Sequence, residues 1–110
     1  MRKHNDPRQL AIALLNRSIC AVQVSAVLAD SYGAFAWSWN HSGEGFGEHA
    51  EAFCLRRANR SRLANATMYV ASRRARNGKM LNSRPCVECQ KLIRCVGSIV
   101  YRDRDGWRMM

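Results

Sequence analysis

Two short motifs constrain the fold of this 110-residue chain more than any other feature. One of them is a Cys-x-x-Cys pair, Cys86 and Cys89, that directly follows Pro85. Proline favours the start of a helix, and residues three apart share one helix face, so one metal ion can bind both thiols. The positive end of the helix dipole also favours the thiolate form that binds metals. We therefore predict a metal-binding helix start at residues 85–89.

The other motif is His49-x-Glu51, at the predicted start of an earlier helix. One imidazole and two thiolates suit Zn²⁺ and leave a fourth tetrahedral position open for water. We therefore predict His49, Cys86 and Cys89 as zinc ligands, with Glu51 beside the water and not bound to the metal. A purely structural zinc site usually closes with a fourth Cys or His, and neither of the other two histidines has suitable spacing. The pattern favours a catalytic centre.

The remaining cysteines have no comparable spacing. A total of five, without a secretory segment, argues against a disulfide framework. Each of the other three lies among apolar neighbours, where a thiol behaves as a small hydrophobic side chain. We expect core positions for Cys20, Cys54 and Cys95.

Hydrophobic periodicity predicts the element order α-β-β-α-β-α-β-β. Helices are expected from Asp6-Pro7 onward, from about 48 to 63 and from 85 to about 96, and strands at 19–30, 34–40, 66–72, 98–103 and 107–110. We expect a glycine-rich loop at residues 41–47 and a long polar loop at residues 73–84. This order predicts one domain, residues 1–110, with an α/β fold: a three-layer α-β-α sandwich around one five-stranded mixed sheet. The short turn before residue 107 makes the last two strands antiparallel.

The charge of the chain is strongly positive. The formal net charge is +10, and no acidic residue lies between Ala52 and Val87. This balance favours a phosphate-bearing partner, with a solvated basic face that only aids solubility as the alternative. The residues predicted to contact nucleic acid are Arg73, Arg74, Arg76, Lys79, Arg84 and Arg102.

No apolar run is long enough to span a bilayer, because Arg, Asp, Asn or Ser interrupts each one. The N-terminal segment is basic and then apolar, but its apolar run AIALL is short and no small-residue cleavage site follows it. We interpret this segment as an amphipathic first helix. We expect a cytoplasmic protein with no membrane partner.

The order H-x-E…P-C-x-x-C is the signature of zinc nucleobase deaminases. From Val22 to Tyr101 the chain resembles a compact member of the cytidine/deoxycytidylate deaminase-like superfamily. Asn40 at the end of the second strand, the strand ATMYV, the stretch SRPCVEC and the closing GSIVY carry the resemblance together with the HAE motif.

The resemblance implies a site and a reaction. It implies Zn²⁺ held by His49, Cys86 and Cys89, with Glu51 as the proton shuttle. It also implies that Asn40 contacts the substrate sugar or base, and that Ala50 and Ser83 line the pocket through backbone groups. In such a site a zinc-activated water attacks C4 of cytosine, or C6 of adenine, and ammonia leaves.

The favoured substrate class is cytosine in a polynucleotide, with single-stranded DNA first. The basic segment 73–84 supports it, as do Phe46 and Tyr101, which we expect to be exposed for stacking on bases. Phe46 precedes the motif helix, where a hydrophobic staple is an equal alternative. Tyr101 ends the fourth strand, where polynucleotide deaminases commonly place a loop that reads the flanking base. Phe35, Trp37 and Trp39 are instead expected in the core or on the sheet surface.

Two alternatives stay open. The chain could deaminate free (deoxy)cytidine or (deoxy)cytidylate, since arginines can equally hold one phosphate. Free-nucleoside enzymes usually carry Asn-x-Glu at the sugar contact, whereas this chain has Asn40-His41-Ser42. The chain could also be a non-catalytic zinc module that binds nucleic acid, although such a module has no need of Glu51. Relatives often assemble, and the sequence leaves the oligomeric state open.

Overall fold

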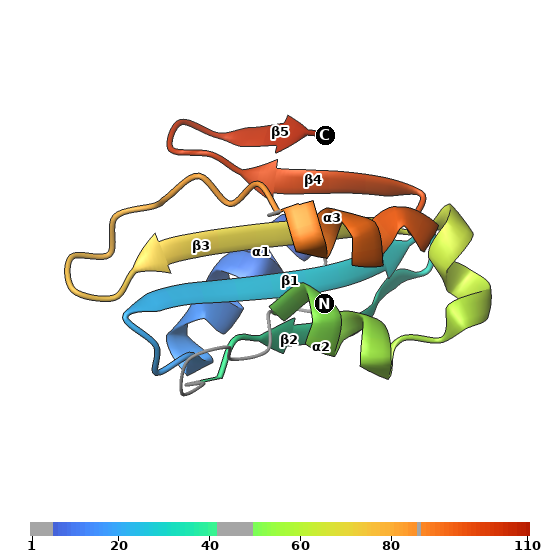
Figure 1. Cartoon of the computed structure of the whole chain (residues 1–110), viewed down its shortest axis with the longest axis horizontal. Helices are drawn as coiled ribbons and strands as arrows, with labels where there is room; N and C mark the ends of the chain where they lie inside the picture. The colour runs from blue at the N-terminus through green and yellow to red at the C-terminus, as the bar shows by residue number, and fades with distance from the viewer. Residues whose placement is uncertain (1–5, 42–49, 86) are drawn as a thin grey trace.

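A computed structural model describes residues 6–41, 50–85 and 87–110. The predicted order of helices and strands is confirmed. Figure 1 shows helices α1 (Pro7–Leu14), α2 (Ala50–Arg57) and α3 (Val87–Leu92), and strands β1 (Val22–Asp30), β2 (Gly33–Trp39), β3 (Thr67–Arg74), β4 (Ser98–Arg102) and β5 (Trp107–Met109). Three short 3₁₀ helices complete the described elements: η1 (Leu15–Arg17), η2 (Arg60–Asn65) and η3 (Ile93–Cys95).

The five strands form one mixed sheet in the order β2-β1-β3-β4-β5. β3 and β4 are parallel, and the other neighbouring pairs are antiparallel. The last two strands pair through Tyr101 and Arg108, which confirms the predicted antiparallel ending. The sheet therefore has one parallel step, and the chain crosses over one face to make it (Figure 1).

Helices cover both faces of the sheet (Figure 1). α1 packs on one face, where Ala11 and Leu14 meet Val27 and Ala71. α2, α3 and η3 pack on the other face over a larger apolar cluster that includes Leu28 and Met68. Since β1 is buried on both faces, it is apolar almost continuously and not alternating. The three-layer α-β-α prediction is confirmed.

The first helix begins where the sequence predicts. The Asp6 side chain accepts a hydrogen bond from the backbone N–H of Arg8 at 2.9 Å, and Pro7 occupies the first turn. This N-cap satisfies one of the helix donors that have no partner within the helix.

Two other helices are shorter than predicted. α2 ends at Arg57, and the chain restarts as η2 after Asn59. The Asn59 side chain accepts from the backbone N–H of Ser61 at 3.0 Å and from its hydroxyl at 2.7 Å, which caps a new turn and explains the break. The predicted helix to residue 96 likewise ends at Leu92 and continues as η3.

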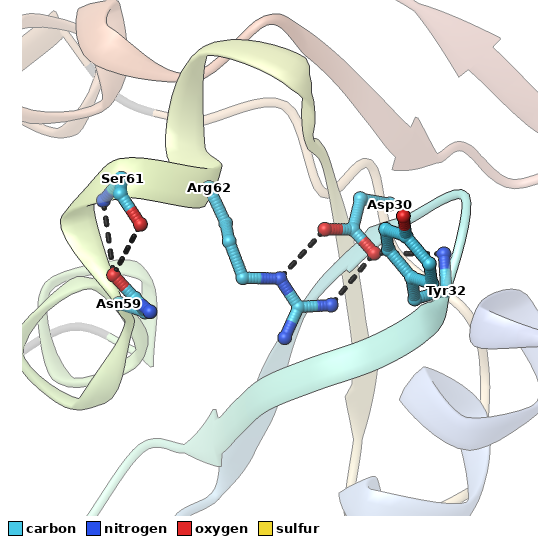
Figure 2. A network of polar contacts seen from close by, with 5 residues as sticks. All are labelled: Asp30, Tyr32, Asn59, Ser61 and Arg62. Atoms are coloured by element: carbon cyan, nitrogen blue, oxygen red, sulfur yellow. Dashed lines mark hydrogen bonds and ion pairs between the residues drawn. The ribbon is translucent and has the colours of Figure 1, made fainter.

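An ion pair fixes the β1–β2 turn against η2 (Figure 2). The Nε and Nη2 groups of Arg62 each donate to the Asp30 carboxylate at 2.7 Å, and the same carboxylate accepts from the backbone N–H of Tyr32 at 2.9 Å. The Arg62 guanidinium also lies 4.1 Å from the ring centroid of Phe35. Its hydrogen bonds hold the pKa of Asp30 below its usual range.

The basic segment 73–84 differs most from its prediction as a loop. β3 continues to Arg74, whose N–H donates to the carbonyl of Lys79 at 2.9 Å, while Leu81 N–H donates to Ser72 at 3.1 Å. Gly78 makes the reversal with φ of +70°, a left-handed conformation that glycine adopts without a steric penalty. The segment, here called the basic hairpin, therefore extends the sheet.

Within the described part of the chain, no helix is long and apolar enough to cross a membrane.

Candidate active site

The two motif helices meet on one face of the sheet. α2 and α3 are in contact there, α2 over β1 and β2 and α3 towards β3 and β4 (Figure 1). Ala50, the first described residue of α2, is fully buried, and Cys89 of α3 is 2% exposed. His49 and Cys86 lie outside the described residues. Among the residues that are described, no three His, Cys, Asp or Glu side chains form a metal site. The predicted zinc site could not appear there, because two of its three ligands are His49 and Cys86.

A buried serine anchors the start of α2. The Ser38 hydroxyl, on β2, donates to the backbone carbonyl of Ala50 at 2.5 Å, and Ser38 is 1% exposed. This bond fixes the first turn of α2 on the sheet next to Glu51. The sequence reasoning missed Ser38. The available signal is a small polar residue between two tryptophans, at an inward-facing position of an alternating strand.

Glu51 is a buried carboxylate, only 4% exposed. Among the residues that the structure describes, none donates a hydrogen bond to it or forms an ion pair with it. In the part of the chain that the structure describes, no fully enclosed side-chain nitrogen or oxygen lacks a hydrogen-bond partner, so the carboxylate oxygens of Glu51 keep contact with open space. The carboxylate is therefore available to a ligand.

Cys54 lies one turn after Glu51 on the buried face of α2. Burial raises the pKa of its thiol to about 12, so it remains protonated at neutral pH. The predicted core position is confirmed. Cys95 is exposed, so its predicted core position is wrong, and Cys20 is half-buried with its thiol 3.8 Å from the Asn40 carbonyl. No disulfide links the described cysteines.

Ser83 lies at the carboxyl ends of the two parallel strands. Its N–H donates to the carbonyl of Arg102 at the end of β4, and its hydroxyl is 2.8 Å from that of Ser72 near the end of β3. Ser83 is 6% exposed. Ligands of open α/β sheets bind outside the carboxyl ends of strands, so this is the expected edge for a pocket.

Asn40 connects the end of β2 to the start of β1. Its side-chain oxygen accepts from the Ser18 hydroxyl at 2.7 Å and from Val24 N–H at 2.9 Å, and its amide donates to the Val22 carbonyl at 2.9 Å. These bonds use both lone pairs of the oxygen and one of the two amide hydrogens. A substrate contact, which stays a prediction, would have to use the other hydrogen.

Residues 1–101 match the family described as the cytidine and deoxycytidylate deaminase zinc-binding region. The chain belongs to this family. No curated protein sequence matches the chain.

Several solved structures share the fold. Cytidine deaminase from Burkholderia pseudomallei superposes with a TM-score of 0.69 at 16% identity, covering 99% of this chain and 92% of that one. Cytidine deaminase from Mycobacterium leprae gives 0.62 at 17% identity, over 93% and 88% of the two chains. RibD from Acinetobacter baumannii gives 0.65 at 22% identity, but the match covers 88% of this chain and only 27% of that one.

Zinc is the metal of this deaminase family. The donor types predicted for it, two thiols and one imidazole, suit zinc. The described part of the site also fits, because Cys89 is buried in α3 and the buried carboxylate of Glu51 lies in the neighbouring helix α2. The described residues of the site are therefore compatible with the zinc centre of this family, and the ligand set stays a prediction.

The predicted aromatic contacts are only partly described. Phe46 lies outside the described residues. Tyr101 is 8% exposed and belongs to the apolar cluster under α2 and α3, so the expectation of an exposed ring is wrong. It is wrong because Tyr101 points to the helix-covered face of β4. A role in substrate binding, from the wall of a pocket, stays a prediction.

The predicted basic contacts divide into two groups. Arg73 is half-buried and donates to Gln23 at 2.7 Å and to Asn16, and Arg102 donates to the Asp103 carbonyl. The other four are exposed, and within the described part of the deaminase chain none of them forms an ion pair: Arg74, Arg76, Lys79 and Arg84. Four of the six predicted basic contacts are therefore exposed on the basic hairpin.

Proposed function

We propose that this chain catalyses the zinc-dependent hydrolytic deamination of cytosine to uracil, with single-stranded DNA as the preferred substrate. In the proposal His49, Cys86 and Cys89 hold the zinc. The observation that carries it is the buried carboxylate of Glu51, which has no described partner and lies in α2 against the helix that bears Cys89.

The proposed roles follow from the chemistry of each group. Bound zinc supplies a water whose pKa falls towards ~7. Glu51 accepts a proton from the attacking water, delivers it to the ring nitrogen and assists protonation of the departing amine. Cytosine and water become uracil and ammonia, so Glu51 ends in its starting state. General acid–base transfer of this kind contributes roughly 10² to 10⁴ in rate.

Neighbouring groups would position the base. Ala50 and Ser83 would contact it through backbone groups, since both are buried beside the motifs. Ser38 supports this arrangement by fixing the Ala50 carbonyl on the sheet. In the proposal Tyr101 lines the pocket wall, Phe46 lies at its entrance, and Asn40 contacts the sugar with its remaining amide hydrogen.

Charge supports the polynucleotide substrate. The formal net charge is +10, and the exposed cations of the basic hairpin have no ion-pair partners in the described part of the chain. Such charges bind the phosphates of a nucleic acid strand. Free cytidine offers no phosphate at all, so it would leave this surface unused.

A second candidate is deamination of a free nucleoside or nucleotide. The fold similarity to cytidine deaminases from two bacteria favours it. In that case the basic hairpin would hold one phosphate or only aid solubility. The non-catalytic zinc module is disfavoured, because a buried carboxylate without a described partner has no use there.

Parallel assays distinguish these functions. Zinc-loaded protein is incubated with a single-stranded DNA oligonucleotide that contains every cytosine context, and separately with deoxycytidylate and with cytidine. Uracil is read by sequencing in the first case and by absorbance in the others, with Glu51→Ala as the control. Uracil in the oligonucleotide, lost in Glu51→Ala at unchanged zinc content, supports the proposal. Turnover of the free substrates alone would support the second candidate function instead. Wild-type activity in the Glu51→Ala variant would overturn the mechanism.

A further inference from the structure

Three aromatic rings form a continuous row from the end of β2 to α2. The ring centroids of Trp39 and His41 are 5.8 Å apart, and those of His41 and Phe53 are 4.9 Å apart in an edge-to-face arrangement. Trp39 closes β2, and Phe53 lies in the first half of α2. The row therefore follows the outer edge of the sheet, because β2 is an edge strand.

A guanidinium lies at each end of this row. The Cζ of Arg17, from η1, is 5.3 Å from the Trp39 ring, and the Cζ of Arg56 is 6.0 Å from the Phe53 ring. Planar guanidinium groups stack on aromatic faces. We call the five residues the stacking ladder: Arg17, Trp39, His41, Phe53 and Arg56.

The ladder is accessible and positively charged. Arg17, His41 and Arg56 are exposed, and Trp39 and Phe53 are half-buried. The elements that supply it, residues 7–17, 33–41 and 50–57, contain one acidic residue, Glu51, which is buried.

The ladder adjoins the proposed site. Phe53 is two residues after Glu51, which places the two side chains on different sides of α2. Glu51 faces the sheet while Phe53 faces the edge with His41. A strand whose target base enters beside Glu51 would therefore have neighbouring bases near the ladder.

We propose that the stacking ladder binds unpaired bases that flank the target cytosine in single-stranded DNA. This inference rests on the proposed function and assigns a part of its substrate to named residues. Proteins that bind single strands combine aromatic stacking with a positively charged track, and the ladder has both. A free nucleotide has only one base, which the reaction site itself takes, and a duplex keeps its bases stacked on each other.

Packing alone is the competing explanation, since touching rings also seal a junction between a strand and a helix. A structural role predicts loss of stability and no dependence on the bases of the ligand. Stacking predicts that the effect of removing a ring disappears when the flanking bases are removed from the DNA. The two explanations therefore separate in a cycle that changes the ring and the base independently.

The experiment uses the whole 110-residue chain, zinc-loaded and with the substitution Glu51→Ala, so that binding is measured without turnover. Fluorescence anisotropy measures Kd for a labelled single-stranded DNA with one cytosine, and for the same strand with abasic flanking positions. The ring variants are His41→Ala, at an exposed position, and Phe53→Leu, which keeps apolar volume. Tyr32→Ala is the matched control, because Tyr32 is 89% exposed at the opposite end of β2. The melting temperature of each variant checks folding.

We expect each ring variant to weaken binding of the intact strand roughly 5- to 100-fold and to leave binding of the abasic strand unchanged. Tyr32→Ala should bind both strands as the parent does. Equal losses on both strands, or no loss, would overturn the inference, and tighter binding of an RNA strand of the same sequence would overturn the assignment to DNA. Absence of strand binding together with cytidine turnover would overturn it as well. These readings do not require catalysis, so failure of the deaminase proposal would be seen separately, as absence of uracil from every substrate.

Discussion

The Ser38 hydroxyl donates to the Ala50 carbonyl at 2.5 Å, and on the other face of the sheet the Ser25 hydroxyl donates to the Ala11 carbonyl at the same distance. Both serines are buried. Each bond attaches a helix to a strand, but only the first attaches α2, which carries Glu51. The pair offers a matched comparison of a bond near the proposed site with one remote from it.

Replacing either serine by alanine should lower the free energy of unfolding by about 1–3 kcal/mol, because a buried carbonyl loses a donor. Only Ser38→Ala should also lower kcat, since it loosens the start of α2. Denaturant unfolding and steady-state kinetics on the same samples check this. Equal kcat values in the two variants would show that the Ser38 bond does not position the site.

The Asp30–Arg62 pair predicts a pH-dependent stability. The folded pKa of Asp30 lies below its ordinary value of about 3.9 because of the Arg62 hydrogen bonds. The stabilisation is therefore present above that value and is lost as pH falls through the folded pKa. Asp30→Asn should melt below wild type at pH 7, and the gap in Tm should close towards pH 2. A gap that stays constant across this range would contradict the prediction.

Gly97 is predicted to be intolerant of a side chain. A Cβ there would lie 2.5 Å from the Ala64 carbonyl oxygen and 2.9 Å from that of Ala66, and both are backbone atoms. Gly97→Ala should destabilise the fold by about 1–3 kcal/mol through overpacking. Gly106→Ala is the control, since nothing lies within 4 Å of its Cβ position. Similar unfolding midpoints for the two variants would rule out the steric explanation.

Zinc binding can be tested with two buried cysteines on adjacent helices. Cys89→Ser should lose zinc in native mass spectrometry, and its Tm should no longer fall on chelation, because metal binding stabilises only the chain that binds it. Cys54→Ser should keep one zinc per chain, since the Cys54 thiol stays protonated. Retention of zinc by Cys89→Ser would remove Cys89 from the ligand set.

The basic hairpin should control the salt dependence of DNA binding. Replacing Arg74, Arg76 and Lys79 by alanine should make the slope of log Kobs against log salt shallower by about 0.7 for each phosphate that the variant no longer neutralises. Arg60→Ala, an exposed arginine on η2, serves as the control for loss of charge alone. An unchanged slope in the hairpin variant would mean that these residues do not bind the strand.

Sequence periodicity predicted the element order and the layers because they depend on local patterns of apolar residues. The helix ends at Arg57 and Leu92 were missed, since the break after α2 depends on the Asn59 side chain. The fold-back at Gly78 was missed for a related reason: its hydrogen bonds join β3 to a segment that its composition marks as a polar loop.

The surroundings of the site residues were harder to predict from the sequence than which residues belong to the site. The motif rule identified Glu51 and Cys89 from spacing, and both are buried on contacting helices. Exposure of Tyr101 was predicted wrongly because a residue at a strand end can face either side of the sheet. The contacts of Asn40, Ser38 and the stacking ladder depend on residues distant in sequence, which periodicity does not reveal.

The pairing of β1 with β3 has a consequence for how the protein folds. Val22 lies opposite Arg74, so the centre of the sheet closes only after most of the chain has been made and brought together. Contacts of such high sequence separation slow folding. The proposed zinc ligands lie in sequence on both sides of β3, so metal uptake during refolding should follow formation of the sheet and report its completion.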